Sequence, residues 1–319
     1  MPKAIEQVLG VTIGHVGLGY RDGAVGSVRS QVHDGDTLAV RAMGDFGVRL
    51  LGVDAPEISF SLPGESEFTE LDDPKWEAFL SNPFAANTPP FKVPLTTGLR
   101  RYLKNRIGFG VALSHHRHAV ATKEAFKNEI LKDIKTLGQS EEAFKFLLVF
   151  SYEVMDRYGR FLCFVNRDQP NPSVPEPRPV TYNLRLLQAA RVYPFFVWPN
   201  IPPFAKQDIL LKAVVPPGKS NEIVEGDETL RLIRQAMHNA RKLKIGIFDG
   251  KDPLKLEPFE IRFLARRYPP DRWVIDLSRN DDTLVHPQKY YSIPHAEDRL
   301  FIPEEYVPLF VESGWKRQA

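Results

Sequence analysis

The sequence contains very little cysteine and no long apolar run. Cys163 is the only cysteine among 319 residues, so the chain can form neither an internal disulfide nor a zinc site built from several cysteines. Its apolar surroundings predict a buried, inert thiol. No stretch approaches the roughly 20 apolar residues of a membrane span, and the N-terminus lacks the apolar core of a secretory signal. We therefore expect a cytoplasmic protein with no membrane partner.

A strong imbalance of charge is also absent. Lys and Arg number 42 and Asp and Glu number 40, which gives a formal net charge of +2. This balance neither requires nor excludes a polyanionic partner, so a nucleic-acid surface would have to come from local clusters of basic residues. The apolar content of 43% is ordinary for a globular protein, and the length suits one elaborated domain or two.

Two short motifs are found in common enzyme families, but neither has the context that its chemistry requires. The glycines of GHVGLGYRDG at 14–23 are in the wrong order for a dinucleotide-binding loop. The tripeptide DFG at 45–47 occurs in kinases, yet no glycine-rich phosphate loop or HRD motif accompanies it. We interpret both motifs as turns.

Hydrophobic patterning predicts a mixed α+β fold with a small antiparallel barrel. LAVRA at 38–42 alternates, MGDFG forms a turn, and VRLLGV at 48–53 resumes an extended run. Residues 141–166 read as two strands around the turn DRYGR. Apolar spacing predicts a helix over 121–137 that ends at Gly138, a shorter helix over 183–192, and a third over 227–244.

Four acids and two arginines stand out near the ends of the predicted strands: Asp34, Asp36, Asp54, Glu57, Arg49 and Arg160. Carboxylates are the oxygen donors that Ca²⁺ and Mg²⁺ prefer, and they repel one another without a cation. Two neighbouring strands could deliver Asp36 and Asp54 to the same rim. Taken singly, each acid also suits a solvated hairpin end. Simple alternation does not bring Arg49 and Asp54 to one face, so a bulge or strand end would have to reorient one of them.

Three of these segments together resemble the signature blocks of the staphylococcal-nuclease (thermonuclease) family. The blocks are DGDT at 34–37, VRLLGVDAPE at 48–57 and DRYGR at 156–160, in the family's order. The segment 183–192 resembles the next helix of that family, and the segment 228–248 resembles its last helix. The resemblance covers residues 24–57 and 119–248 and implies a five-stranded OB-fold β-barrel with flanking helices, whose open face commonly holds single strands.

The resemblance implies a Ca²⁺-dependent nuclease that hydrolyses DNA or RNA, prefers single strands and leaves 3′-phosphate ends. Asp36 and Asp54 would bind the ion through their side chains and Ala55 through its backbone carbonyl, with Asp34 in the outer shell. Glu57 would activate water. Arg49 and Arg160 would hold the scissile phosphate, where they would stabilise developing charge. Arg157, in place of an expected lysine, and Tyr158 would contact an adjacent phosphate. Because cytoplasmic free Ca²⁺ is low, Mg²⁺ or Mn²⁺ is the alternative ion.

The resemblance divides the chain into an N-terminal segment 1–23, a nuclease domain 24–248 and a C-terminal extension 249–319. Residues 58–118 form an insertion rich in proline and turn residues, and we expect it to be irregular with one or two short helices. Deleting 60–117 would then alter substrate choice more than folding. Protein partners are left open.

Several features keep other interpretations open. SHHRH at 114–118 could bind a transition metal, although no carboxylate is adjacent in sequence, and the basic stretch 100–106 could contact phosphates or be a solvated helix face. Aromatic residues at 193–198 could stack on bases or belong to the core, and the tail residues could form a binding surface or pack against the barrel. The chain could also be a catalytically restrained or inactive nucleic-acid- or protein-binding module, or a nuclease whose insertion closes its cleft. The residues concerned are Tyr193, Phe195, Phe196 and Trp198, with Arg266, Arg267 and Trp273 in the tail.

Overall fold

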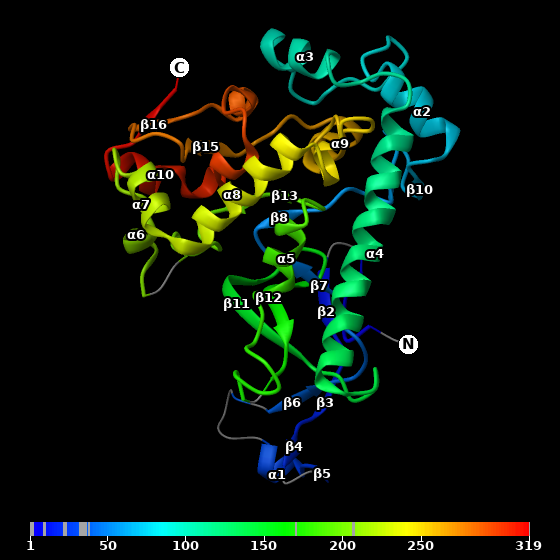
Figure 1. Cartoon of the computed structure of the whole chain (residues 1–319), viewed down its shortest axis with the longest axis vertical. Coiled ribbons are helices and arrows are strands. Elements are labelled where there is room, and N and C mark those ends of the chain that lie inside the picture. Colours follow the sequence, from blue (N-terminus) through cyan, green and yellow to red (C-terminus); the bar gives the residue numbers. More distant parts are fainter. Residues whose placement is uncertain are drawn as a thin grey trace. The chain divides into compact units, whose positions relative to one another are not determined.

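The structure, a computed structural model, mixes helices and strands, which confirms the α+β class (Figure 1). The strands that it describes form sheets of two or three strands, and they do not close into a barrel. The predicted OB-fold barrel is therefore not confirmed. The described residues are 3–8, 11–21, 24–31, 37, 39–169, 171–205 and 208–318.

The chain divides into two compact units, and each is described by itself. Unit 1 comprises Met1–Leu50 and Val149–Cys163, and unit 2 comprises Leu51–Leu148 and Phe164–Ala319. The chain passes from one unit to the other after Leu50, within the strand β11 (Phe146–Met155) and within the strand β12 (Phe161–Arg167).

Unit 1 is built from short strands. β12 runs parallel to β7, with Phe161 opposite Val48, and the three-stranded sheet has the order β11-β12-β7. The remaining strands pair as β1-β2, β3-β6 and β4-β5. The elements of unit 1 outside β11 and β12 are β1 (Ile5–Val8), β2 (Val11–Gly14), β3 (Val16–Leu18), β4 (Tyr20–Arg21), β5 (Ala24–Val25), α1 (Val28–Gln31), β6 (Val40–Ala42) and β7 (Val48–Leu50).

Unit 2 contains most of the helices and a second three-stranded sheet in the order β14-β17-β15. Its α-helices are α2 (Pro74–Ser81), α3 (Thr97–Lys104), α4 (Val111–Leu137), α5 (Tyr182–Gln188), α6 (Leu210–Ala213), α7 (Ser220–Gly226), α8 (Glu228–Leu243), α9 (Pro258–Arg266) and α10 (Val307–Glu312). Its strands are β8 (Val53–Asp54), β9 (Ser59–Ser61), β10 (Phe68–Glu70), β13 (Tyr193–Pro194), β14 (Phe196–Val197), β15 (Trp273–Asp276), β16 (Thr283–Leu284), β17 (Arg299–Ile302) and β18 (Lys316–Arg317). Short 3-10 helices are η1 (Gly246–Phe248), η2 (Pro287–Ser292), η3 (Ala296–Asp298) and η4 (Glu304–Tyr306).

The three helices predicted from apolar spacing are present as α4, α5 and α8. α4 ends where predicted, because Gly138 adopts the left-handed conformation that closes a helix. α8 begins after Asp227, whose side chain accepts a hydrogen bond from the backbone N–H of Leu230. α4 starts earlier than predicted, at Val111, so SHHRH lies on a helix and not in an irregular segment.

The insertion and the C-terminal tail form one hydrophobic core. Trp76 and Leu80 of α2 and Leu99 of α3 are fully buried in the same cluster as Ile261 and Leu264 of α9. β17 adds Phe301 to this cluster. The insertion is therefore an integral part of unit 2, and we now expect its deletion to impair folding rather than only to alter substrate choice.

Cys163 is buried, as predicted, and burial raises the pKa of its thiol to about 11. No helix within the described ranges combines the length and apolarity needed to cross a membrane.

Leu264→Ala tests the shared core from the side of the tail. Leu264 is fully buried, so its truncation should cost about 2–5 kcal/mol in the free energy of unfolding, measured with urea. Leu99→Ala, on the insertion side, should cost a similar amount. Leu211→Ala is the control because Leu211 is 54% exposed, and it should change stability by no more than about 0.5 kcal/mol. A neutral Leu264→Ala would contradict a shared core.

Candidate active site: a carboxylate pair bridged by an arginine

Asp54 and Glu57 lie in unit 2 at the end of β8 and in the turn that follows. β8 pairs antiparallel with β13, which places Asp54 opposite Tyr193. Asp54 is only 2% exposed, while the side chain of Glu57 is 24% exposed. The backbone N–H of Glu57 donates a hydrogen bond to Nε2 of His115 on α4, at 2.8 Å. The turn is therefore fixed to both a strand and a helix.

The side chain of Arg262 bridges the two carboxylates. Nη2 of Arg262 donates to Oδ2 of Asp54 at 2.8 Å, and Nη1 donates to Oε1 of Glu57 at 2.7 Å. These are charge-assisted hydrogen bonds of the strong kind, formed by a side chain that is 12% exposed. Two of the acids that the sequence singled out thus converge on one cation, and that cation belongs to the protein.

Buried ion pairs and hydrogen bonds hold the helix that carries Arg262. α9 begins with Pro258 at its first turn and with a capping box between Glu257 and Glu260. Glu257 also accepts two hydrogen bonds from Nη1 of Arg299, at 2.8 and 3.0 Å. Oε1 of Glu260 accepts a hydrogen bond from the hydroxyl of Tyr290. Arg262 is consequently presented to Asp54 and Glu57 from a rigid element.

The carboxylates keep Arg262 charged in spite of its burial. Burial acts to lower the pKa of this guanidinium, but Asp54 and Glu57 outweigh burial and raise the pKa above its ordinary value. With both carboxylates ionised, the three groups together carry a net charge of −1. A divalent ion in place of the guanidinium would bring that sum to zero.

His115 is a neutral imidazole beneath the turn. Burial is the main cause that lowers its pKa to about 3, and the charges of His118, Arg262 and His116 act in the same direction. Because Nε2 accepts the Glu57 hydrogen bond, the proton of the neutral ring belongs on Nδ1. Nδ1 has no hydrogen-bond partner among the described residues. His115 therefore positions the backbone of Glu57 without adding charge.

The remaining predicted metal ligands are only partly described. Asp34 and Asp36 lie outside the described residues. Ala55 is exposed in the turn after β8. Arg49 is half-buried on β7 of unit 1, in parallel register with Leu162.

The turn DRYGR of unit 1 carries three of the predicted phosphate-binding residues, Arg157, Tyr158 and Arg160. Nε and Nη2 of Arg160 contact Oδ2 of Asp156 at 2.8 and 2.6 Å, and the Arg160 side chain is 38% exposed. Nη2 of Arg157 donates to the hydroxyl of Tyr158 at 2.7 Å, and both guanidinium groups lie over the Tyr158 ring. Gly159 has a φ of +78°, and a Cβ there would lie 2.7 Å from Ile5. The tight turn thus holds an accessible pair of cations.

Tyr193 and Phe195 belong to the packed interior. Tyr193 is 7% exposed and meets Phe248 edge-on, at 5.8 Å between ring centroids. Phe195 is half-buried and packs on Phe301, at 4.8 Å. Tyr193 is thus buried, whereas Phe195 is partly exposed and also has the guanidinium of Arg272 over its ring, at 5.7 Å from the centroid.

The three histidines of SHHRH have three separate partners. His115 contacts the backbone of Glu57, and Nε2 of His118 contacts the carbonyl of Asp252 at 2.6 Å. His116 lies near two carboxylates that are remote in sequence, Glu70 and Asp72. The histidines therefore do not converge on one site, and the carboxylates near His116 come from a segment that is remote in the sequence.

The described residues fit a cation but do not fit Ca²⁺ in this arrangement. Carboxylate oxygens are suitable donors for Ca²⁺, and Asp54 and Glu57 can both reach one positively charged group. The position that they share is filled by the Arg262 guanidinium. A divalent ion would have to displace this guanidinium in order to contact both carboxylates.

Arg262 is the residue that the sequence reasoning missed. It lies 205 positions from Glu57, beyond the reach of any local pattern. The available signal was an arginine inside the apolar run IRFLA of a predicted packed tail. A cation flanked by core residues requires a buried partner, and the acids of β8 supply it.

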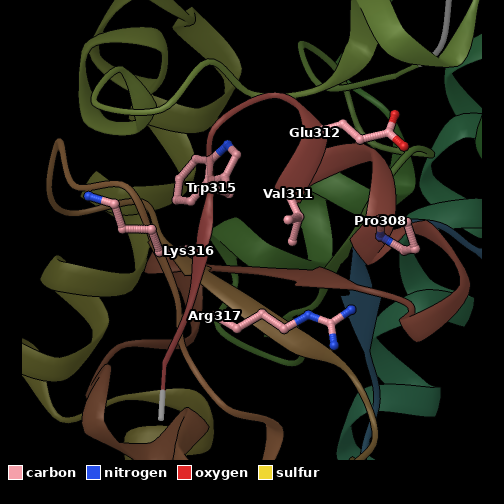
Figure 2. Close-up of a pocket in the computed structure, with 6 residues that line it drawn as sticks. All are labelled: Pro308, Val311, Glu312, Trp315, Lys316 and Arg317. Carbon is pink, nitrogen blue, oxygen red and sulfur yellow. The ribbon is translucent and has the colours of Figure 1, made fainter.

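No protein-family model, curated protein or solved structure was found to match the chain. The thermonuclease resemblance therefore depends on the sequence motifs alone. A separate hollow lies at the C-terminal end of unit 2, between α10 and β18 (Figure 2). It includes none of the predicted site residues, and it is lined by Pro308, Val311, Glu312, Trp315, Lys316 and Arg317.

The neutral His115 predicts a dependence of stability on pH. The folded pKa is about 3 and the unfolded pKa is near 6.5, so the stability from the neutral ring is complete above pH 6.5. That stability is lost as the pH falls from 6.5 towards 3, because the unfolded state gains the proton first. At pH 5 the loss should be about 2 kcal/mol.

His115→Gln should flatten the curve of unfolding free energy against pH by about this 2 kcal/mol between pH 7 and 5, since glutamine supplies an acceptor that does not titrate. His295→Gln, at an exposed histidine, is the control and should leave the curve unchanged. Identical curves for His115→Gln and the wild type would show that His115 is not held neutral.

Proposed function

We propose that this protein is a phosphodiesterase acting on DNA or RNA, and that Arg262 restrains it in the state described. The sequence support is the three thermonuclease-like blocks in their family order. The observation that carries the proposal is the convergence of Asp54 and Glu57 on one cation, at 2.8 and 2.7 Å. The fold proposed for the nuclease domain, residues 24–248, is the five-stranded OB-fold barrel.

The assigned roles require Glu57 to be released. The Glu57 carboxylate is engaged by Nη1 of Arg262 at 2.7 Å, so it must leave this ion pair before it can act on water. Arg160 needs less rearrangement, because its pair with Asp156 is partly exposed and such pairs contribute only about 0–1 kcal/mol. Under this proposal, Arg49 and Arg160 hold the scissile phosphate, and Arg157 and Tyr158 contact its neighbour.

The required ion follows from the charge balance of the site. A divalent ion that Asp54 binds after Arg262 has moved away would offset the carboxylate charge and would leave Glu57, released from its ion pair, available to act on water. When bound, such an ion would polarise the phosphate and offset its developing charge.

The alternative is a nucleic-acid-binding module that does not cleave. The fixed position of α9 favours it, since Glu257 and Glu260 hold the helix through buried partners. In that case Arg262 is a permanent substitute for a metal ion. The two functions differ in whether removal of the Arg262 charge creates activity.

A surface for the polyanion is available on α3. Arg100, Arg101 and Lys104 are exposed on this helix. Arg106, just beyond the helix, lies 3.6 Å from Glu260 of α9, so the basic helix is connected to the helix that carries Arg262. We assign α3 to phosphate contacts in both functions.

Arg262→Met is the decisive variant for the choice between them. It removes the charge while keeping much of the volume, so Ca²⁺-dependent cleavage of single-stranded DNA and RNA should rise at least about tenfold over the wild type, which is 1.4 kcal/mol. Adding Glu57→Gln to this variant should lower the rate by about 10²–10⁴. A chelator should abolish cleavage.

Two controls accompany this assay. Lys255→Met changes an exposed cation three residues before the same helix and should leave the rate at its wild-type value. Arg262→Lys keeps the positive charge, but an ammonium group cannot bridge both carboxylates as the guanidinium does. It is the second variant to be measured if Arg262→Met does not fold. Nucleic-acid binding without cleavage in every variant, under every divalent ion, would replace the nuclease by the binding module.

Neutralising α3 should weaken nucleic-acid binding and its salt dependence. Changing Arg100, Arg101 and Lys104 to glutamine should reduce the slope of log affinity against log salt by about 0.7 for each phosphate of a single strand that is no longer neutralised. The matched control replaces three exposed lysines of α4, Lys123, Lys132 and Lys135. Equally weakened binding by the two triple variants would show that α3 has no special role.

A further inference from the structure

Three potential metal ligands meet on the surface of unit 2, away from the carboxylate pair. Nε2 of His116 lies 3.6 Å from Oε2 of Glu70, and Nδ1 lies 3.7 Å from Oδ2 of Asp72. One ligand atom from each residue can be chosen so that all three lie within 4.8 Å of one another. The His116 side chain is 14% exposed, whereas the carboxylates are open to solvent.

Local structure brings the two acids close together. β10 ends at Glu70 and Asp72 lies in the turn that follows, where the backbone N–H of Asp73 donates to the carbonyl of Glu70 at 3.1 Å. Leu71 is fully buried, and its backbone N–H donates to the carbonyl of Ile58 at 2.9 Å. The core therefore anchors the segment through Leu71 and directs the two acids outward.

The first turn of α4 is held equally firmly. The backbone N–H of Gly110, the residue before α4, donates to Oε1 of Glu77 on α2 at 2.5 Å. Inside α4, His115 is fixed by the backbone of Glu57. His116 is the next residue, so its ring is carried to the edge of the helix that faces Glu70 and Asp72.

The two separations involve different ring nitrogens, and both exceed the about 2.7–3.2 Å of a hydrogen bond between an imidazole nitrogen and a carboxylate. A single ion takes one of these nitrogens, and the three ligand atoms available to it lie within 4.8 Å of one another. Ligand atoms about 2.0–2.1 Å from a tetrahedral zinc ion are separated by about 3.3 Å, so the solvent-exposed carboxylates would have to rotate inward to bind it.

We propose that Glu70, Asp72 and His116 bind a divalent transition metal ion, with Zn²⁺ as the preferred ion. An imidazole nitrogen favours Zn²⁺ over the oxygen-preferring Ca²⁺ and Mg²⁺, and Zn²⁺ exceeds Mn²⁺ in general affinity. The ion takes one ring nitrogen and one oxygen from each carboxylate. Water completes the coordination, as in other zinc sites with three protein ligands.

The bound ion would join the β9-β10 hairpin to α4. β9 begins two residues after Glu57, and α4 carries the histidine that holds the Glu57 backbone. A metal here would stabilise the surroundings of the carboxylate pair without contacting it. The site does not depend on the proposed nuclease function.

The test is Zn²⁺ binding to the purified full chain after treatment with a chelator. Calorimetry should give one Zn²⁺ per chain, Co²⁺ should produce the visible absorption of a low-symmetry site, and Zn²⁺ should raise the melting temperature. His116→Gln, Glu70→Gln and Asp72→Asn should each weaken binding by about tenfold or more, since loss of even an outer partner has that effect.

Glu67→Gln in the same hairpin and His295→Gln are matched controls, because both residues are exposed and lie outside the cluster. Asp54→Asn should also retain Zn²⁺ binding, which separates this site from the proposed catalytic one. Absence of Zn²⁺ binding, or undiminished binding by His116→Gln, would overturn the proposal.

Discussion

The ion pairs of Arg262 with Asp54 and Glu57 are the contacts on which the interpretation of unit 2 depends. Two carboxylates at the end of one short strand would repel each other in a nearly dry environment, so the site needs a cation. Here an arginine from a helix about two hundred residues later provides it. Loss of one member of such a buried pair typically costs about 3–5 kcal/mol, because the partner charge is left uncompensated. The same charges therefore serve the stability of the fold and are candidates for chemistry.

The insertion and the tail support this arrangement from opposite sides. The tail supplies Arg262 on α9, and the insertion supplies His115 on α4, which holds the Glu57 backbone. Both segments bury residues in one core, as Leu99 and Leu264 illustrate. A site assembled in this way can respond to anything that moves α9 or α4. Release of Arg262 would expose two carboxylates at once and change the charge of the site by one unit.

The sequence predicted local features well. Apolar spacing and Gly138 located the end of α4, and apolar spacing located α8 to within one residue at each end. Asp54 and Glu57 were recognised because a purely structural hairpin does not require carboxylates at the end of an apolar strand. These signals succeed because cause and effect lie within a few residues of each other.

Long-range partners could not be predicted in the same way. Nothing local indicates that Arg262 meets Glu57, or that Glu70 and Asp72 meet His116, because those contacts depend on how helices pack. The start of α4 was missed because polar residues, among them His115 and His118, occupy its buried face where apolar ones were expected. The barrel was expected from family resemblance, and the described strands do not close into one.

The most direct test of the central claim, that Arg262 and a divalent ion compete for Asp54 and Glu57, is the Ca²⁺ affinity of the intact chain. Calorimetry would compare the wild type with Arg262→Met, each measured with and without the further substitution Asp54→Asn. We predict that Arg262→Met binds Ca²⁺ at least about tenfold more tightly than the wild type, equivalent to 1.4 kcal/mol, and that Asp54→Asn removes the gain. Equal Ca²⁺ affinity with and without the arginine charge would contradict the account.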